Sequence, residues 1–379
     1  MRGHGVDQNE SVLWEASPHT LAKHRVYEQY LSKWMPIMIR SWKGDVTYAE
    51  GFAGPGVYLG GEPGSPVIAL RAVIRDPTLR LLARDLRFLF VEGDKRRAVR
   101  LEGELEKAAS PVPLAKLAHY GIDLAVEPGD YDPALSNLLT EHNAWGRPML
   151  VVLDTWGGAV KLDLVRRIAR NPSSEILITF GPQYFARFAE VTSIQHGDIV
   201  FGDAGWRDVA GQPADKKTQW MLNKYRDVLV DVGFAFVLSF ELVDDRGQSL
   251  FLVFGTTHVR GLQKMKEAMW EVDPVHGVQY RDPADPNQQL LDIEPEPVTA
   301  PLRRELSQYL RDQPGQAASV SDLRQFALYR TVYKESQVKP ALDQLVSEGI
   351  VVGDAVGGRV RLGGTVRLTT AGIGHGNGR

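Results

Sequence analysis

A glycine-rich loop follows the first apolar segment of this 379-residue chain, Val46–Tyr48. The loop reads Glu50-Gly-Phe-Ala-Gly-Pro-Gly56 and continues to Gly64-Ser-Pro66. Because glycine has no Cβ, the main chain at Gly54 and Gly56 can approach a ligand that any other residue would keep at a distance. Loops of this composition also occur as tight turns without a ligand. The chemistry therefore depends on which other functional groups converge on the loop.

Three acidic residues each stand at or just after the end of a predicted strand. Glu92 ends one apolar segment, Asp130 follows the next segment after a short turn, and Asp154 ends the one after that. Ligands of open α/β sheets bind at the carboxyl ends of the strands, so we expect these acids to lie beside the glycine loop. Each acid alone is typical of a helix cap or a solvated turn. Together with Glu50, they favour a binding site.

The elements that must position these residues alternate between strand and helix. The predicted strands are Val46–Glu50, Phe88–Glu92, Ile122–Val126, Met149–Asp154 and Ile176–Phe180. The predicted helices are Pro18–Ile39, Pro66–Ile74, Lys95–Ala108, Ala134–His142, Val160–Arg170 and Lys216–Val232. Such alternation predicts an α/β fold, with a parallel sheet and helices on both of its faces.

The last two apolar segments, Phe234–Val243 and Leu250–Phe254, are joined only by the polar turn Asp244–Gln248. They must pair antiparallel, because a parallel crossover needs a dozen or more residues. Five parallel strands plus an antiparallel hairpin is the layout of the Rossmann-like class I methyltransferase sheet. A nicotinamide-binding Rossmann sheet would stay parallel to its last strand.

Within that layout, the loop matches the acid-x-Phe-x-Gly-x-Gly form of the S-adenosylmethionine loop of many nucleic-acid methyltransferases. We therefore predict an S-adenosyl-L-methionine site. The loop would hold the methionyl and ribose part of the cofactor, Glu92 the ribose hydroxyls, and Asp130 the adenine amino group. The predicted cofactor-binding residues are Glu50, Phe52, Ala53, Gly54, Pro55, Gly56, Glu92, Asp130 and Tyr131.

Several segments of the chain resemble the three-Cys-motif partner proteins (TcmP). These are the helix with Lys23-His24 and Tyr30-Leu31, the stretch Phe52–Pro66, Glu92 at its strand end, and His258–Trp270. The resemblance covers roughly residues 18–272 and a C-terminal winged-helix-like tail. It implies a methyltransferase-like fold and a partner encoded nearby, a cysteine-motif protein that looks like a radical enzyme.

The candidate catalytic residues are Asp154 and Trp156, in Asp154-Thr155-Trp156-Gly157. Many members of the resembled family have Asp-Pro-aromatic-Gly here. DNA amino-methyltransferases use Asp/Asn-Pro-Pro-aromatic, in which the polar head orients the target amine and the aromatic ring stacks on the extruded base. This chain keeps the acid and the aromatic residue but has neither proline, so methylation of a base amine stays open.

The chain has no cysteine, which excludes a thiolate nucleophile, a cysteine zinc site and cytosine C5 methylation. Its nine histidines are scattered, without a His-Glu-x-x-His helix, so we expect no metal. No apolar run approaches the ~18 residues that span a bilayer. The start lacks the apolar stretch of a secretory signal. We expect a cytoplasmic protein with no membrane partner.

Composition divides the chain. We expect a methyltransferase-type domain over residues 1–272, a linker over 273–300, a winged-helix domain over 301–370 and a disordered tail over 371–379. Residues 301–379 carry a net charge of +4, and the first 300 residues carry −7. A basic module on an acidic body favours a polyanionic partner. The candidate nucleic-acid-binding residues are Arg330, Lys334, Lys339, Arg359, Arg361 and Arg367.

Some of these features also have a structural interpretation. Leu262, Met265 and Met269 have helical spacing, which is more typical of core packing than of a functional motif. His258 and Lys264 or Lys266 could still touch a substrate. For Lys23 and His24, we favour a solvated helix face over contact with the cofactor.

The leading hypothesis is an S-adenosylmethionine-dependent methyltransferase that acts on nitrogen or oxygen of a nucleic acid or a nucleotide-like substrate. The alternative is a catalytically silent DNA- or protein-binding partner of a cysteine-motif radical enzyme, which Thr155 in place of proline favours. A second alternative is a metal-dependent nuclease. Asp85 and Glu92-Gly-Asp-Lys95 approximate its Asp…Glu-x-Lys pattern, but the lysine is one position too far along.

Overall fold

The computed structural model describes residues 12–155, 158, 160–191, 196–244, 246–281, 299–356 and 359–370. These residues form two compact units. The first comprises residues 1–268 with 279–289, and the second comprises 269–278 with 290–379. The second unit thus begins inside helix α10 (Val259–Val272).

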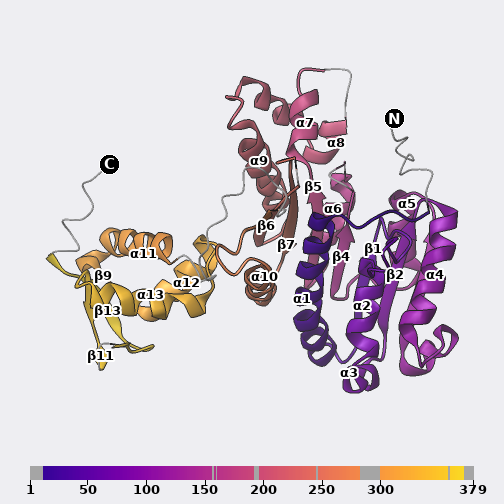
Figure 1. Ribbon diagram of the computed structural model, residues 1–379, viewed down its shortest axis with the longest axis horizontal. Coiled ribbons are helices and arrows are strands. Elements are labelled where there is room, and N and C mark those ends of the chain that lie inside the picture. The colour runs from indigo at the N-terminus through magenta and orange to yellow at the C-terminus, as the bar shows by residue number, and fades with distance from the viewer. Residues whose placement is uncertain are drawn as a thin grey trace. The chain divides into compact units, whose positions relative to one another are not determined.

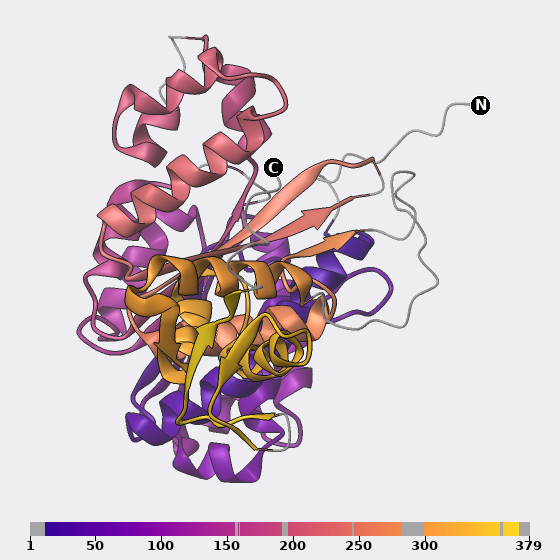
Figure 2. The same ribbon diagram turned by 90° about the vertical axis from the view of Figure 1, so that its left-hand side faces the viewer.

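The first unit is built on an eight-stranded sheet with the order β3-β2-β1-β4-β5-β7-β6-β8 (Figure 1). Its strands are β1 (Val46–Glu50), β2 (Leu86–Glu92), β3 (Ile122–Pro128), β4 (Met149–Leu153), β5 (Ser174–Phe180), β6 (Phe236–Val243), β7 (Ser249–Thr256) and β8 (Gln279–Arg281). Strands β1 to β5 pair parallel with their neighbours. β7 runs antiparallel to both β5 and β6 (Figure 2).

This strand order confirms the α/β fold with a Rossmann-like class I methyltransferase sheet and its antiparallel hairpin. β1, β2 and β5 are buried along their whole length, as expected of parallel strands covered on both faces. The order of the strands reverses between β1 and β4. Ligands of such sheets bind at this switch point, outside the carboxyl ends of the strands.

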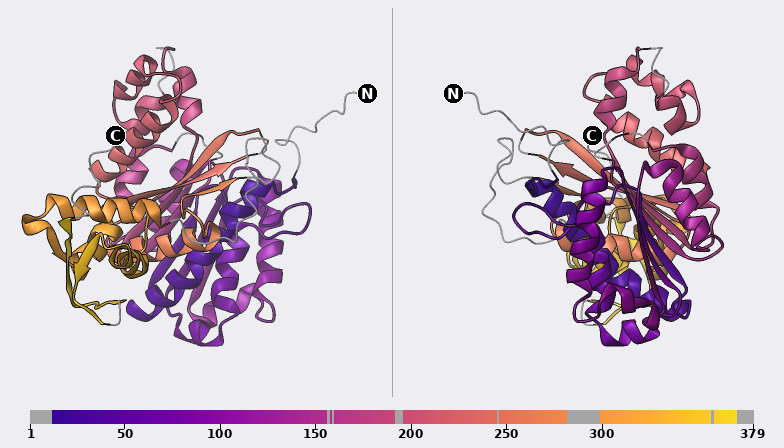
Figure 3. Two further views of the ribbon diagram at one scale, coloured as in Figure 1. Left: turned by 60° about the vertical axis from the view of Figure 1, so that its left-hand side comes forward. Right: turned by 90° about the vertical axis from the view of Figure 1, so that its right-hand side faces the viewer.

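Helices cover both faces of this sheet (Figure 3). One layer contains α1 (Pro18–Ser41), α2 (Ser65–Ile74), α3 (Pro77–Leu82) and α4 (Lys95–Ala109). The other face buries an apolar cluster that includes side chains of α5 (Tyr131–Glu141), α6 (Leu162–Ala169) and α9 (Lys217–Asp231). A 3-10 helix, η1 (Leu114–Tyr120), precedes β3.

A helical insertion separates β5 from α9 and was not predicted. It consists of α7 (Pro182–Phe188), α8 (His196–Phe201) and the 3-10 helix η2 (Ala204–Gly211). Stacked rings join it to the sheet, because the ring centre of Phe180 in β5 lies 5.4 Å from that of Phe185 in α7. The ring centre of Phe180 also lies 4.2 Å from that of Tyr225 in α9. The elements are too short for periodicity to show, and the aromatic cluster supplies their packing.

The second unit contains α11 (Ala300–Asp312), α12 (Val320–Arg330) and α13 (Glu335–Ser347) around an apolar core. Its three-stranded sheet has the order β10-β13-β9, from Val351–Gly353, Thr365–Leu368 and Ala317–Ser319. A two-stranded ribbon joins β11 (Ala355–Val356) to β12 (Arg359–Val360), and η3 (Pro314–Gln316) precedes β9. Three helices and a hairpin agree with the expected elements, whereas β9 was missed.

Within the expected linker, Gln279–Arg281 forms β8 and pairs parallel with β6 of the main sheet. Residues 282–298 and the expected tail over 371–379 lie outside the described residues.

Candidate active site

A cavity of about 570 Å³ opens at the carboxyl edge of the sheet, beside the switch point. Its wall contains the loop Phe52–Tyr58, the strand end Glu92 with Gly93 and Asp94, and Asp154. The structure thus brings together the predicted loop and two of the predicted acids.

The loop is held in a defined conformation. Val57 pairs antiparallel with Pro63, and Gly64 N donates to Gly56 O at 2.8 Å. Gly54 has a φ of +66°, and a Cβ there would meet no protein atom within 4 Å. Gly56 has a φ of +77°, but its Cβ would lie 2.8 Å from the Leu101 side chain of α4. Gly54 therefore leaves room for a ligand, whereas glycine at position 56 serves internal packing.

Glu92 connects the loop to strand β2. Its Oε2 accepts from Gly54 N at 2.8 Å, and its Oε1 accepts from Asp94 N at 3.0 Å. The side chain is buried yet lines the cavity. Because each carboxylate oxygen has two lone pairs, Glu92 can accept two further hydrogen bonds from a ligand. This capacity suits a vicinal diol.

Glu50 lies behind the cavity rather than in its wall. It is 1% exposed, and its two oxygens accept from Tyr48 Oη and Ser65 Oγ, both at 2.7 Å. Burial raises the pKa of Glu50 to about 8, although both hydroxyls lower it. The structure therefore places Glu50 as a support between β1 and α2, and not where it would meet a ligand's ammonium group directly.

Asp154, which lines the cavity, forms an ion pair with Lys23 of α1, which is not among the lining residues. Burial opposes ionisation of Asp154, but the ammonium of Lys23, helped by Thr179, keeps the pKa of this carboxyl below its usual value. Both side chains are largely buried, at 12% and 4% exposed. The cavity therefore presents a fixed carboxylate whose counter-charge lies behind its wall.

Helix α1 supplies more than Lys23. His24 is also buried, and its ring lies 5.4 Å from the ring of Tyr58 in the glycine loop. Burial and the charge of Lys23 lower the pKa of His24 to about 3, so the ring is neutral. Our expectation of a solvated face for Lys23 and His24 is wrong: the helix packs on α2 and brings both residues under the loop.

Thr155 takes the place of the first expected proline. Its hydroxyl lies within hydrogen-bonding distance of two carbonyl oxygens, Gly158 O at 3.1 Å and Thr179 O at 3.2 Å, and its single hydrogen is shared between them, which fixes the turn after Asp154. Trp156, the second candidate catalytic residue, lies outside the described residues.

Asp130 and Tyr131 are not among the residues that line this cavity. Asp130 is the N-cap residue of α5, without a capping hydrogen bond from its side chain. The ring of Tyr131 lies 4.7 Å from that of Phe52, and its Oη accepts from Lys161 N at 3.0 Å. Tyr131 thus contacts the cavity wall from behind, through Phe52.

Sequence reasoning missed one wall of the cavity. Trp14 lies there, with the guanidinium of Arg97 4.8 Å from the centre of its ring. Trp14 O also accepts from Leu59 N at 2.9 Å, which ties the N-terminal segment to the loop. No periodicity surrounds Trp14, and the short apolar run Val12-Leu13-Trp14 was its only signal in the sequence.

The candidate nucleic-acid-binding side chains of the second unit differ in exposure and in the contacts that they already make. Arg330, Arg359, Arg361 and Arg367 are exposed. Lys339 pairs with Asp343 at 2.8 Å on α13, and Lys334 lies 5.7 Å from the ring centre of Trp270.

The nuclease pattern is not assembled. Asp85 precedes β2 and Glu92 ends it, so the two carboxylates stand at opposite ends of a strand roughly 20 Å long. In the part of the chain that the structure describes, no group of three His, Asp or Glu side chains could hold a metal ion. Nor does any described helix have the length and apolar character needed to cross a membrane.

Neither a protein-family model nor a curated protein sequence matches the chain. Among solved structures, it is similar to the O-methyltransferase from Bacillus cereus in complex with SAH, with 11% identity and a TM-score of 0.32 over 67% of this chain and 84% of that one. It is also similar to the O-methyltransferase TomG from Streptomyces achromogenes in complex with SAM (16% identity, TM-score 0.32, covering 60% and 79%). Cofactor-bound Rv0187 from MTB gives 11% identity and a TM-score of 0.32 over 64% and 91%. Likeness at this level adds nothing to the fold class, which rests on strand order and direction.

Proposed function

We propose that the protein is an S-adenosylmethionine-dependent methyltransferase that acts on oxygen or nitrogen of a nucleic acid or a nucleotide-like substrate. The observation that carries the proposal is the cavity at the switch point, where Gly54, Glu92 and Asp154 meet. Class I methyltransferases use the same edge of a sheet with the same strand order.

The residues present fit the cofactor. Gly54 leaves open space where any Cβ would project, and Glu92 retains acceptor capacity for the ribose hydroxyls. Trp14 and Phe52 offer apolar wall to the nucleoside. S-adenosylmethionine supplies an electrophilic methyl group when bound. The chain's own contribution is to position the acceptor in line with that group and to exclude water.

Asp154 defines how the methyl acceptor is held. An ionised carboxylate accepts a hydrogen bond from a hydroxyl or an amine and holds it in place. Lys23 does not line the cavity and acts through Asp154, by keeping that carboxyl ionised. A carboxylate of this kind suits a hydroxyl and an amine equally, so both oxygen and nitrogen remain in the proposal.

A second candidate function is a silent binding partner. Asp154 is neutralised by Lys23, Glu50 accepts from two protein hydroxyls, and Thr155 replaces the proline of catalytic motifs. The resemblance to the TcmP family supports a cysteine-motif protein as the partner. Exposed Arg359, Arg361 and Arg367 support phosphate contacts by the second unit, which we propose to be a winged helix.

The two functions are separated by measuring binding and turnover together. Calorimetry with S-adenosylmethionine should give micromolar affinity, and a methyl-release assay with RNA, DNA, nucleotides and phenolic acceptors should give product. Binding without product for every acceptor class, combined with recovery of a cysteine-motif protein in pull-downs, would favour the silent partner. Absence of cofactor binding would refute both the methyltransferase and the site.

A further inference from the structure

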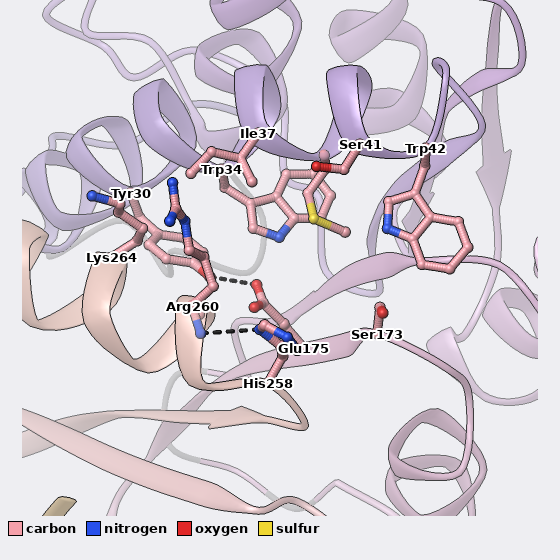
Figure 4. A pocket seen from close by; sticks show the side chains of 12 residues that line it. Tyr30, Trp34, Ile37, Ser41, Trp42, Ser173, Glu175, His258, Arg260 and Lys264 are labelled. Atoms are coloured by element: carbon pink, nitrogen blue, oxygen red, sulfur yellow. Dashed lines mark hydrogen bonds between the residues drawn. The ribbon is translucent and has the colours of Figure 1, made fainter. Parts of the chain in front are cut away.

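A second cavity, of about 410 Å³, lies at the opposite edge of the same sheet, where β5 begins (Figure 4). Its walls come from the second half of α1, the start of β5 and the start of α10. The length of β5 separates the two edges by roughly 20 Å, so this cavity is not part of the candidate active site. It also includes His258 and Lys264, which the methyltransferase site does not use.

One wall is an aromatic face of α1. Tyr30, Trp34, Met38 and Trp42 follow one another at intervals of four residues, which places them on one side of the helix. Trp34 is 3% exposed at the inner end, and Trp42 is 40% exposed at the outer end. Figure 4 shows both indole rings on the α1 side, facing Glu175 and Ser173. The wall therefore offers aromatic surface to a flat ligand, mainly from the exposed ring of Trp42.

Glu175 is the polar group at the inner end. It is 5% exposed and accepts hydrogen bonds from Tyr30 Oη and, at 3.1 Å, from Thr256 Oγ1. One lone pair on each carboxylate oxygen remains for a ligand. Gly261 makes room for this carboxylate, because a Cβ there would lie 2.1 Å from Glu175 Oε1.

A buried donor lies next to this acceptor. The indole Nε1 of Trp34 has no hydrogen-bond partner among the described residues. It nevertheless lies close enough to Glu175 to lower the pKa of that carboxyl. A ligand acceptor would give this buried N–H the well-formed hydrogen bond that Glu175 does not.

Basic side chains line the exposed outer end of this cavity. His258 and Arg260 are exposed, and the Arg260 guanidinium forms no ion pair with any residue that the structure describes. Lys264 also lines the cavity but pairs with Glu267 at 2.7 Å. The outer end is therefore suited to an anion, and the inner end to a neutral polar edge.

We propose that this cavity binds a guanine nucleotide, with the base inside and the phosphate at the mouth. Guanine presents two adjacent N–H donors, N1–H and N2–H₂, which match the two oxygens of Glu175. Its O6 acceptor lies beside them and matches the Trp34 N–H. The base would pack against the aromatic wall of α1, and Arg260 with His258 would bind the phosphate.

Other ligands satisfy the site less well. Uracil has one N–H between two carbonyl groups, and adenine offers only its amino group beside an acceptor nitrogen, so each leaves one Glu175 oxygen unmatched. A quaternary ammonium suits aromatic walls and a carboxylate. The cations at the mouth oppose it, however. This inference does not depend on whether the chain transfers methyl groups.

The test is calorimetry on the full chain at pH 8 with GMP, AMP, UMP, choline and inorganic phosphate. We expect GMP to bind at least about tenfold more tightly than AMP or UMP, since the others leave buried groups unpaired. GMP should not compete with S-adenosylmethionine. Stronger binding of choline than of GMP, equal binding of the three nucleotides, or displacement of GMP by S-adenosylmethionine would each overturn the proposal.

Single substitutions test which side chains contact the base and which contact the phosphate. Arg260→Gln, at an exposed position, should weaken all nucleotides about tenfold, the value of one charge-assisted contact. Trp34→Phe keeps the ring and removes the N–H, and it should reduce the preference for GMP over UMP. Arg25→Gln, exposed on the same helix but outside the cavity, is the control and should bind GMP like the wild type. Unchanged GMP binding in both Arg260→Gln and Trp34→Phe would refute the assignment.

Discussion

The two cavities lie at opposite edges of one sheet, and their walls differ in kind. Helix α1 lines one of them and supports the other through the Lys23–Asp154 ion pair. The cavity at the carboxyl edge is framed by the main chain of a glycine loop and by charged side chains that already neutralise or support one another. The cavity at the other edge is framed by aromatic side chains, with a buried donor and a free cation among the described residues.

This difference indicates different tasks. Where main chain forms the wall, a side chain added at one position fills the site, and the surrounding polar groups hold a fixed electrostatic arrangement. Where side chains form the wall, recognition depends on matching single donors and acceptors. The first arrangement suits a cofactor that presents a reactive group, and the second suits selection between similar ligands. The predictions below test this contrast, beginning with the largest expected effect.

The Lys23–Asp154 pair gives the first test. Lys23→Met leaves a buried carboxylate without its counter-charge, and we expect a loss of about 3–5 kcal/mol in the free energy of unfolding. Lys23→Met combined with Asp154→Asn should recover most of that stability but no turnover. Chemical denaturation measures the free energy of unfolding of the single and the double variant, and the methyl-release assay measures turnover. A loss below about 1 kcal/mol in the single variant would show that the pair is solvated.

Gly54→Arg tests the main-chain wall. The new side chain projects into open cavity space, so S-adenosylmethionine affinity should fall at least about 100-fold. Gly61→Arg is the matched control. Gly61 lies in the same loop with a φ of +91°, and a Cβ there would also meet no protein atom within 4 Å, but the residue does not line the cavity. GMP binding should be unchanged in both variants. Equal cofactor affinity in the two variants would contradict the site.

The sequence predicted the carboxyl-edge cavity better than the other one, for a physical reason. A glycine loop and acids at strand ends are local signals, and parallel strands bring them together automatically. Even so, the burial of Glu50 and Lys23 was not predicted, because burial depends on how α1 packs over the loop and not on local spacing. The hydroxyls of Tyr48 and Ser65 donate to Glu50, and its role in cofactor binding stays a prediction.

The other cavity is formed by residues from three distant parts of the chain, 30–42, 173–175 and 258–264. His258 and Lys264 were singled out, but Glu175 begins an apolar strand and gave no signal of its own. The five parallel strands and the antiparallel hairpin were predictable from lengths and alternation, whereas the order of the strands was not predicted. The insertion after β5 and the strand β9 were not, since short elements carry too little periodicity.

The polar network behind the glycine loop makes stability depend on pH. Burial raises the pKa of Glu50 to about 8, above its value in the unfolded chain. The folded state therefore keeps a proton that the unfolded state loses, and stability falls by about 1.4 kcal/mol per pH unit between about pH 4.5 and pH 8 from this group. Glu50→Gln should flatten that slope. Exposed Glu102→Gln is the control, and an unchanged slope in Glu50→Gln would place the titration elsewhere.

The smallest effect concerns the aromatic cavity. Burial raises the pKa of Glu175 to about 7, while Tyr30, Thr256 and Trp34 act against it. The ionised carboxylate accepts both N–H groups of guanine and the protonated carboxyl cannot, so GMP affinity should rise as the pH increases from 6 to 8, by less than about tenfold. Arg260, Lys264 and His258 are the other charged or titratable side chains that line the cavity.

Glu175→Gln should abolish the rise in GMP affinity with pH. Calorimetry at pH 6, 7 and 8 with GMP and UMP measures this dependence. Because uracil offers one N–H, its affinity should change less with pH than that of guanine. An equal change for both nucleotides would mean that Glu175 does not contact the base.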